Sequence, residues 1–139
     1  MAQQEIKLDW LDKMAFSSKV NGHEIILDAS GEGGGDDRGP RPKGLMLVAL
    51  AGCTGMDVIS ILKKMRVDVE AFSIRVVGDL TEEHPKHFTG LRVIYEFKGK
   101  DLPLDKLQKA IDLSQERYCG VSTSYRKGME ITTEITIVE

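Results

Sequence analysis

Cysteine and histidine, the residues that most often bind metals in proteins, are scarce in this chain. Among its 139 residues there are only two cysteines, Cys53 and Cys119, and three histidines. Two cysteines are too few for the disulfide framework of a small secreted protein. The opening sequence MAQQEIKLDW also lacks the apolar segment of a secretion signal. We therefore expect a cytoplasmic protein whose thiols are reduced.

The histidines give little indication of a metal site. His84 and His87 have a ligand-like spacing, but they lie in a polar stretch at residues 81–87 with no cysteine nearby. A solvated turn around Pro85 accounts for them better than a bound metal does. We expect neither a metal nor any other cofactor.

The chain has no excess of basic charge. Its formal net charge is -3, and no arginine-rich stripe or stripe of alternating basic and aromatic residues occurs. A nucleic-acid partner is therefore not expected.

Residues 30–39 contain no apolar side chain and hold five glycines in ten positions. This stretch is not a phosphate-binding loop, because Lys43 is followed by Gly44 and Leu45 and not by a serine or threonine. We expect a flexible connector. A mobile lid, with Arg38 and Arg41 as its useful charges, is the alternative.

The longest apolar run, LMLVALAGCTGMDVISIL at residues 45–62, predicts a central helix over residues 42–66. A proline just inside the start and cations over the last turn suit the two ends of a helix. Apolar or small residues occupy nearly every position, so the helix must be buried in protein or in lipid. Asp57 and Ser60 interrupt the run, and the rest of the chain is typical of amphipathic strands. We therefore expect no membrane span.

The remaining patterns predict strands, one further long helix and a candidate short helix over residues 121–128. Residues 1–29 form an antiparallel meander around an Asn21-Gly22 turn, with Trp10 at the parity of a core residue. After the central helix, two strands form a hairpin around residues 81–87, the first of them bulged where its alternation slips near residue 71. A helix then runs from about residue 103 to Tyr118, with Gly120 as its stop, and a final strand covers residues 129–137. Residues 67–139 thus form a strand-strand-helix-strand half, and the chain is a single α+β domain with antiparallel sheets.

A homodimer follows from the all-apolar helix. The sheet of one subunit can hardly cover the whole circumference of such a helix, so we expect two of these helices to pack together. The small residues Ala49 and Gly52, together with Met56, would lie at their closest approach.

The two cysteines have a structural and a functional interpretation. A buried free cysteine behaves as a small apolar residue. Two thiols on facing elements can instead form a disulfide if their Cα atoms lie within about 7 Å. Reactivity requires a thiolate, and Asp57, one helical turn from Cys53, would raise the thiol pKa. Activation would have to come from a cation, for which the candidates are Arg38, Arg41, Lys43 and Arg126.

Several motifs together resemble the OsmC/Ohr family of osmotically inducible and organic-hydroperoxide-resistance proteins. They are Pro42-x-x-Leu45, Ala51-Gly52-Cys53-Thr54, Met56-Asp57-Val58, His84-Pro85-x-x-Phe88 and Glu116-Arg117-Tyr118-Cys119. The resemblance covers nearly the whole chain from about residue 10. It implies an intertwined α+β homodimer in which sheets wrap around two long central helices.

The activity that the resemblance implies is thiol-dependent reduction of hydroperoxides, especially organic ones. Cys53 would attack the O–O bond, Cys119 would resolve the sulfenic acid as a disulfide, and an external dithiol would restore both thiols. Met46, Met56 and Phe72 would line an apolar pocket for the alkyl tail of the peroxide.

Two positions depart from the family pattern. Lys43 stands where the active enzymes have glutamate, and no arginine occurs around Phe16, where they have an activating arginine. Arg38, Arg41 or Lys43 would have to substitute. The alternatives are therefore a non-enzymatic dimer that binds a small apolar ligand and a thiol redox sensor.

Overall fold

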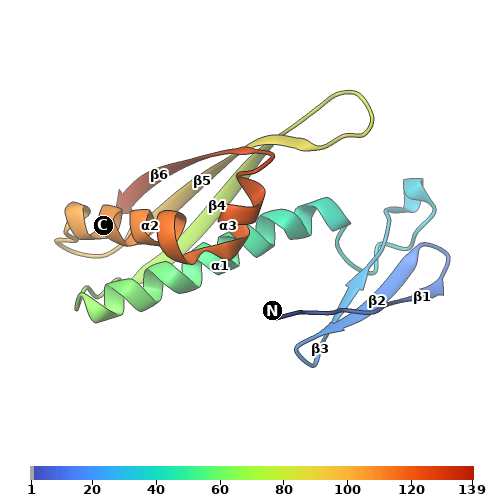
Figure 1. The fold of residues 1–139 in the computed structure, drawn as a ribbon, viewed down its shortest axis with the longest axis horizontal. Coiled ribbons are helices and arrows are strands. Elements are labelled where there is room, and N and C mark those ends of the chain that lie inside the picture. Colours follow the sequence, from blue (N-terminus) through green and yellow to red (C-terminus); the bar gives the residue numbers. More distant parts are fainter. Residues whose placement is uncertain (1) are drawn as a thin grey trace. The chain divides into compact units, whose positions relative to one another are not determined.

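The computed structural model describes residues 2–139, and Figure 1 shows their secondary structure. The elements in chain order are β1 (Leu8–Asp12), β2 (Ala15–Val20), β3 (His23–Leu27), the 3₁₀ turn η1 (Gly31–Gly33), α1 (Pro42–Lys64), β4 (Ala71–Leu80), β5 (Phe88–Lys98), α2 (Leu104–Leu113), the π-helical turn η2 (Ser114–Tyr118), α3 (Gly120–Tyr125) and β6 (Glu130–Val138). Two compact units result, one up to Met46 and the other from Leu47 to Glu139. The division into a single domain with four segments stays a prediction.

The first unit contains the expected antiparallel meander, with strand order β1-β2-β3. Asn21 and Gly22 join β2 to β3 with φ angles of 52° and 82°, the left-handed conformation that a tight hairpin turn requires. The expectation for Trp10 is wrong. Its side chain is 66% exposed, and its indole N–H donates to the carbonyl of Lys13 at 2.9 Å.

The glycine-rich segment is ordered around the buried carboxylate of Asp28. The backbone N–H groups of Ala29, Asp36 and Arg38 donate to this carboxylate at 2.7, 3.2 and 3.1 Å, and the Arg38 guanidinium donates to it at 3.2 Å. A side chain on Gly35 would overlap the carbonyl of Ala29. The segment therefore needs glycine for close backbone approach as well as for turning.

These hydrogen bonds set the pKa of Asp28. Burial alone would raise it, but the three backbone N–H groups and the Arg38 guanidinium together lower the pKa from 3.8 to about 2. Asp28 therefore stabilises the folded state fully above its unfolded-state pKa, and this contribution is lost as the pH falls through about 2.

Replacement of Asp28 by asparagine tests this coupling. We expect Asp28→Asn to be less stable than wild type near neutral pH, and the difference to shrink as the pH falls from about 4 towards 2. Urea unfolding at a series of pH values measures it, with the exposed Asp68→Asn as the control. A difference that did not change with pH would contradict the assignment.

The second unit contains a three-stranded sheet with β5 in the centre. β4 and β5 form the expected antiparallel hairpin, but β6 pairs with β5 in the parallel direction, from Gly90 with Glu130 to Lys98 with Val138. The expectation of purely antiparallel sheets is therefore wrong. The physical reason is the connection between the two strands, because α2 and α3 carry the chain back across the sheet and so make a parallel crossover.

The predicted bulge near residue 71 is a loop. Helix α1 ends at Lys64, Arg66 has a φ of 60°, and the N–H of Val67 donates to the carbonyl of Leu62 at 2.9 Å. Strand β4 begins only at Ala71, so the slip in alternation marks the start of the strand.

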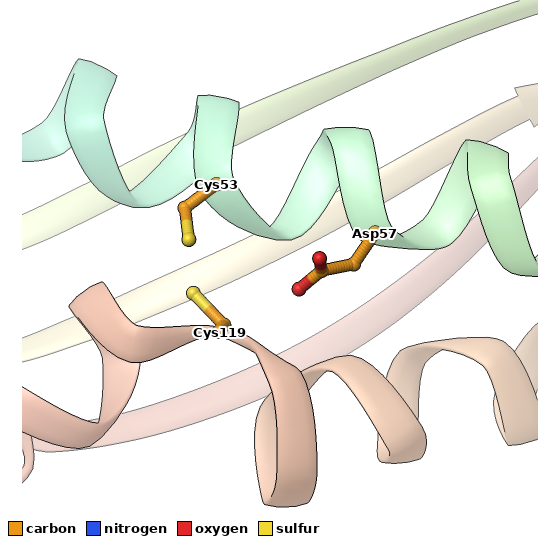
Figure 2. A group of neighbouring side chains, drawn as sticks. All are labelled: Cys53, Asp57 and Cys119. Atoms are coloured by element: carbon orange, nitrogen blue, oxygen red, sulfur yellow. The ribbon is translucent and has the colours of Figure 1, made fainter.

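The part of helix α1 after Met46 packs on the sheet, as do α2 and α3; Figures 1 and 2 both show these segments in front of the strands. Leu50, Thr54, Val58 and Leu62, one turn apart, form the buried stripe of α1. They meet a core that includes Leu107 and Ile111 of α2 and Tyr95 and Phe97 of β5. The opposite side of α1 is open in the single chain, where Val48 and Met56 are 63% and 77% exposed.

Candidate active site

Cys53 and Cys119 face each other within the second unit, and Asp57 lies beside them (Figure 2). The two sulfurs and a carboxylate oxygen of Asp57 all lie within 4.8 Å of one another. Cys53 and Asp57 are four residues apart on α1, so they share one face of the helix. The structure thus brings together the two thiols that the sequence singled out and the acidic residue next to them.

The end of the second helix positions Cys119. The helix widens into the π-helical turn η2, after which the N–H of Cys119 donates to the carbonyl of Ser114 at 2.7 Å. Cys119 is extended and caps α3, accepting the N–H of Ser122 on its sulfur at 3.3 Å. Gly120 therefore begins a helix, whereas the sequence predicted that it ends one.

The two thiols differ in their surroundings. Cys119 is 1% exposed, and Cys53 is half-buried. Burial raises the pKa of Cys119 to about 11; the Ser122 N–H lowers it, while Cys53 and Asp57 raise it further. Cys119 is consequently a neutral thiol at physiological pH.

A chain of buried hydrogen bonds leads to Asp57. The Ser114 hydroxyl donates to the Asp57 carboxylate at 2.9 Å, so Ser114 must accept the proton of Thr54, 2.7 Å away. Thr54 then accepts from the Tyr95 hydroxyl at 2.7 Å, and Tyr95 accepts from the amide of Gln115 at 2.9 Å. We call this series of hydrogen bonds the Asp57 relay; its members are Gln115, Tyr95, Thr54, Ser114 and Asp57. Each hydroxyl in the relay donates its proton in the direction of the carboxylate.

The far end of the Asp57 relay is also fixed. The side-chain oxygen of Gln115 accepts from Ser122 at 2.6 Å and from Arg126 at 2.9 Å. Arg126, a candidate cation in the sequence, thus binds Gln115. The sequence singled out Asp57, and Thr54 as part of a motif, but not the other three relay residues.

Removal of the Tyr95 hydroxyl tests the relay. We expect Tyr95→Phe to lower the free energy of unfolding by about 1–3 kcal/mol, because Thr54 loses a donor and Gln115 an acceptor in the core. Tyr118→Phe is the matched control, because Tyr118 is 57% exposed and should tolerate the change. Equal denaturation midpoints for the two variants would contradict the network.

The other candidate cations lie in the first unit or at its end. Arg38 is ion-paired with Asp12 at 2.6 Å and with Asp28 at 3.2 Å, and Arg41 is ion-paired with Asp37. Lys43 is exposed in the first turn of α1. Within residues 2–139, no ion pair links Arg38, Arg41 or Lys43 to either thiol or to Asp57.

Two of the three predicted pocket residues, Met56 and Phe72, line an open apolar groove of about 550 Å³ between α1 and β4. The other lining residues are Val48, Ala51, Gly52, Gly55, Ile59, Ser73 and Ile74. Met46 is half-buried at the end of the first unit.

The second unit is a mixed sheet covered by helices, and its two thiols face each other between α1 and the segment before α3 (Figure 2). This arrangement defines a small α+β dithiol protein. The sequence matches the family model described as OsmC-like protein over residues 33–134, and the chain belongs to this family. The expected family is thus confirmed. By length and composition α1 is apolar enough to cross a membrane, but its part after Met46 packs on the sheet of the second unit.

Similar proteins cover the chain almost completely. Protein YhfA of Escherichia coli (strain K12) is 32% identical over 135 residues, 96% of this chain and 98% of its own. A hypothetical protein from Aquifex aeolicus VF5 has a similar structure, with a TM-score of 0.86 and 30% identity. The match covers 99% of this chain and 98% of the Aquifex chain. The organic hydroperoxide resistance protein OsmC of Legionella pneumophila shares the fold, with a TM-score of 0.70, 15% identity and 98% coverage of both chains.

Proposed function

We propose that this protein reduces organic hydroperoxides with Cys53 and Cys119 as its redox pair. The observation that carries the proposal is the approach of the two sulfurs to within 4.8 Å, from two different elements of one unit. A disulfide needs a sulfur separation of about 2 Å, which a modest movement of the side chains would provide.

The environments of the two thiols support different roles for them. Cys53 is the more exposed, so a peroxide reaches it first, and its thiolate attacks the O–O bond to give a sulfenic acid and an alcohol. Cys119, buried and protonated, then attacks the sulfenic acid, which forms the disulfide and releases water. An external dithiol reduces this disulfide and is itself oxidised. Such a cycle suits the reducing cytoplasm.

The comparisons support the substrate class. The Legionella protein carries an organic-hydroperoxide-resistance name, as does OhrB of Bacillus subtilis, which shares the fold with a TM-score of 0.67. Members of the OsmC/Ohr family act on hydroperoxides. We carry this activity to the present chain on the basis of its two facing thiols.

The activating cation is part of the proposal. Arg38 and Arg41 are ion-paired with carboxylates of their own unit. Lys43 precedes Cys53 by ten residues on α1, about 15 Å along the helix axis, so it would have to act on the thiol of a second subunit. Replacement of Lys43 by methionine keeps the length of the side chain and removes its charge.

A homodimer completes the proposal. Only 22% of the residues in the apolar run of α1 are buried within the chain, and Met56, which lines the apolar groove beside it, is exposed. A second copy packed on this face would bury the small residues Ala49 and Gly52 at the centre of the interface. The apolar walls around Met56 and Phe72 would then accept the alkyl tail of a peroxide.

Thiol titration tests the function. One equivalent of tert-butyl hydroperoxide is expected to consume both thiols of the reduced, metal-free protein, and a dithiol reductant should then support repeated turnover. Consumption of both thiols without turnover would refute the peroxidase and favour a thiol redox sensor. Thiols that stay free would leave the non-enzymatic, ligand-binding dimer.

A further inference from the structure

The thiol pair and Asp57 also form a set of metal ligands. The three donor atoms are the two sulfurs and a carboxylate oxygen, they all lie within 4.8 Å of one another, and they converge from α1 and from the segment before α3 (Figure 2). This cluster was not evident from the sequence, where the only ligand-like spacing was that of His84 and His87.

The cluster is rich in groups that carry or acquire negative charge. Within residues 2–139 no ion pair involves Asp57, whose carboxylate accepts a hydrogen bond from the neutral hydroxyl of Ser114. A divalent cation would compensate this charge directly.

The dimensions and the ligand types fit zinc. Zn–S bonds of about 2.3 Å and Zn–O bonds of about 2.0–2.2 Å place the ligands of a tetrahedral site roughly 3.5–3.8 Å apart. The three donor atoms reach that spacing by closing from at most 4.8 Å. Two thiolates and one carboxylate suit Zn²⁺ far better than Mg²⁺ or Ca²⁺, which prefer oxygen ligands only.

The surroundings already orient two of the ligands. Ser114 donates to the Asp57 carboxylate and the Ser122 N–H points at the Cys119 sulfur. Behind Ser114, the Asp57 relay is fully buried and leaves no buried side-chain donor or acceptor unpaired among the described residues. Hydrogen bonds of this kind fix metal ligands in position in known sites.

We propose that the reduced protein binds one Zn²⁺ per chain through Cys53, Asp57 and Cys119, with a fourth position open to water. The site uses the same thiols as the proposed peroxide reduction but does not require that activity. Oxidation would release the metal: a hydroperoxide takes two electrons from the two thiolates, and with two protons yields the disulfide, an alcohol, water and free Zn²⁺.

Titration of the full-length protein tests the site. The reduced, metal-free protein is titrated with Zn²⁺ against a chromophoric chelator and, separately, with Co²⁺ alone. We expect one metal per chain, a thiolate-to-cobalt charge-transfer band, and visible cobalt bands of tetrahedral intensity. Asp57→Asn, which keeps an acceptor for Ser114, should weaken Zn²⁺ binding roughly tenfold or more. The double variant Cys53→Ser/Cys119→Ser should bind none.

Two controls separate this site from the rest of the chain. Asp112→Asn removes an exposed carboxylate of α2, and His87→Gln removes the other ligand-like spacing. Both should bind Zn²⁺ as wild type does, and circular dichroism should show all variants folded. Wild-type protein without a charge-transfer band, or unchanged affinity in Asp57→Asn, would overturn the proposal.

Turnover of tert-butyl hydroperoxide by the metal-free protein separates the two proposals. Zinc binding without turnover supports the metal site and refutes the peroxidase. Turnover without zinc binding supports the peroxidase and refutes the metal site.

Discussion

Replacement of Cys53 by serine is expected to lower the rate of organic hydroperoxide reduction by on the order of a thousandfold. The reason is that the attacking thiolate has no substitute: Cys119 is 1% exposed and burial raises its pKa to about 11. The measurement is the consumption of cumene hydroperoxide by the metal-free variant in the presence of a dithiol, compared with wild type.

Cys119→Ser is the matched control for this variant. It should still consume one equivalent of peroxide in a single turnover, because Cys53 remains, but it should accumulate a sulfenic acid that a dimedone probe labels. Undiminished turnover in Cys53→Ser would remove this residue from the mechanism. Dimedone labelling at Cys119 in Cys53→Ser would show that Cys119 attacks the peroxide, which contradicts the assigned roles.

Met56→Asp is expected to convert the proposed homodimer into a monomer. Met56 is 77% exposed in the single chain and lines the apolar groove beside α1. Met56→Asp would place a charge in the proposed interface from each subunit, and an unpaired charge in a desolvated interface weakens association by roughly a hundredfold or more. Light scattering at micromolar concentration measures the change in mass.

Leu104→Asp provides the comparison for this substitution. Leu104 is 57% exposed on α2 and does not line the groove, so the same change there should leave the dimer intact. A wild-type protein that is already monomeric at micromolar concentration would contradict the proposed dimer.

Much of the fold could be predicted because the apolar pattern is strong. The run around Cys53 predicted α1 almost to its ends, and Asn21-Gly22 predicted the first hairpin. The direction of β6 could not be predicted from its alternation, since a strand with one buried face has the same pattern in a parallel and in an antiparallel pair. The exposure of Trp10 was also missed, because alternation gives parity but does not show whether anything covers that face of the strand.

The site could be predicted only in part. The resemblance to the family paired Cys53 with Cys119, and helical spacing placed Asp57 beside Cys53. The rest of the Asp57 relay depends on contacts between residues up to 61 positions apart, such as that of Gln115 with Thr54. No local pattern encodes such a contact. The useful signal was a polar residue at a core position, as Ser114 is at the start of η2 and Thr54 on α1.

Intact-mass analysis and peptide mapping after one equivalent of tert-butyl hydroperoxide test the central claim most directly. The reduced, metal-free protein should lose two thiol hydrogens per chain and yield a peptide in which Cys53 and Cys119 of the same chain are joined. Over-oxidation of Cys53 with Cys119 still free, or two unmodified thiols, would contradict the claim that these residues form one redox pair.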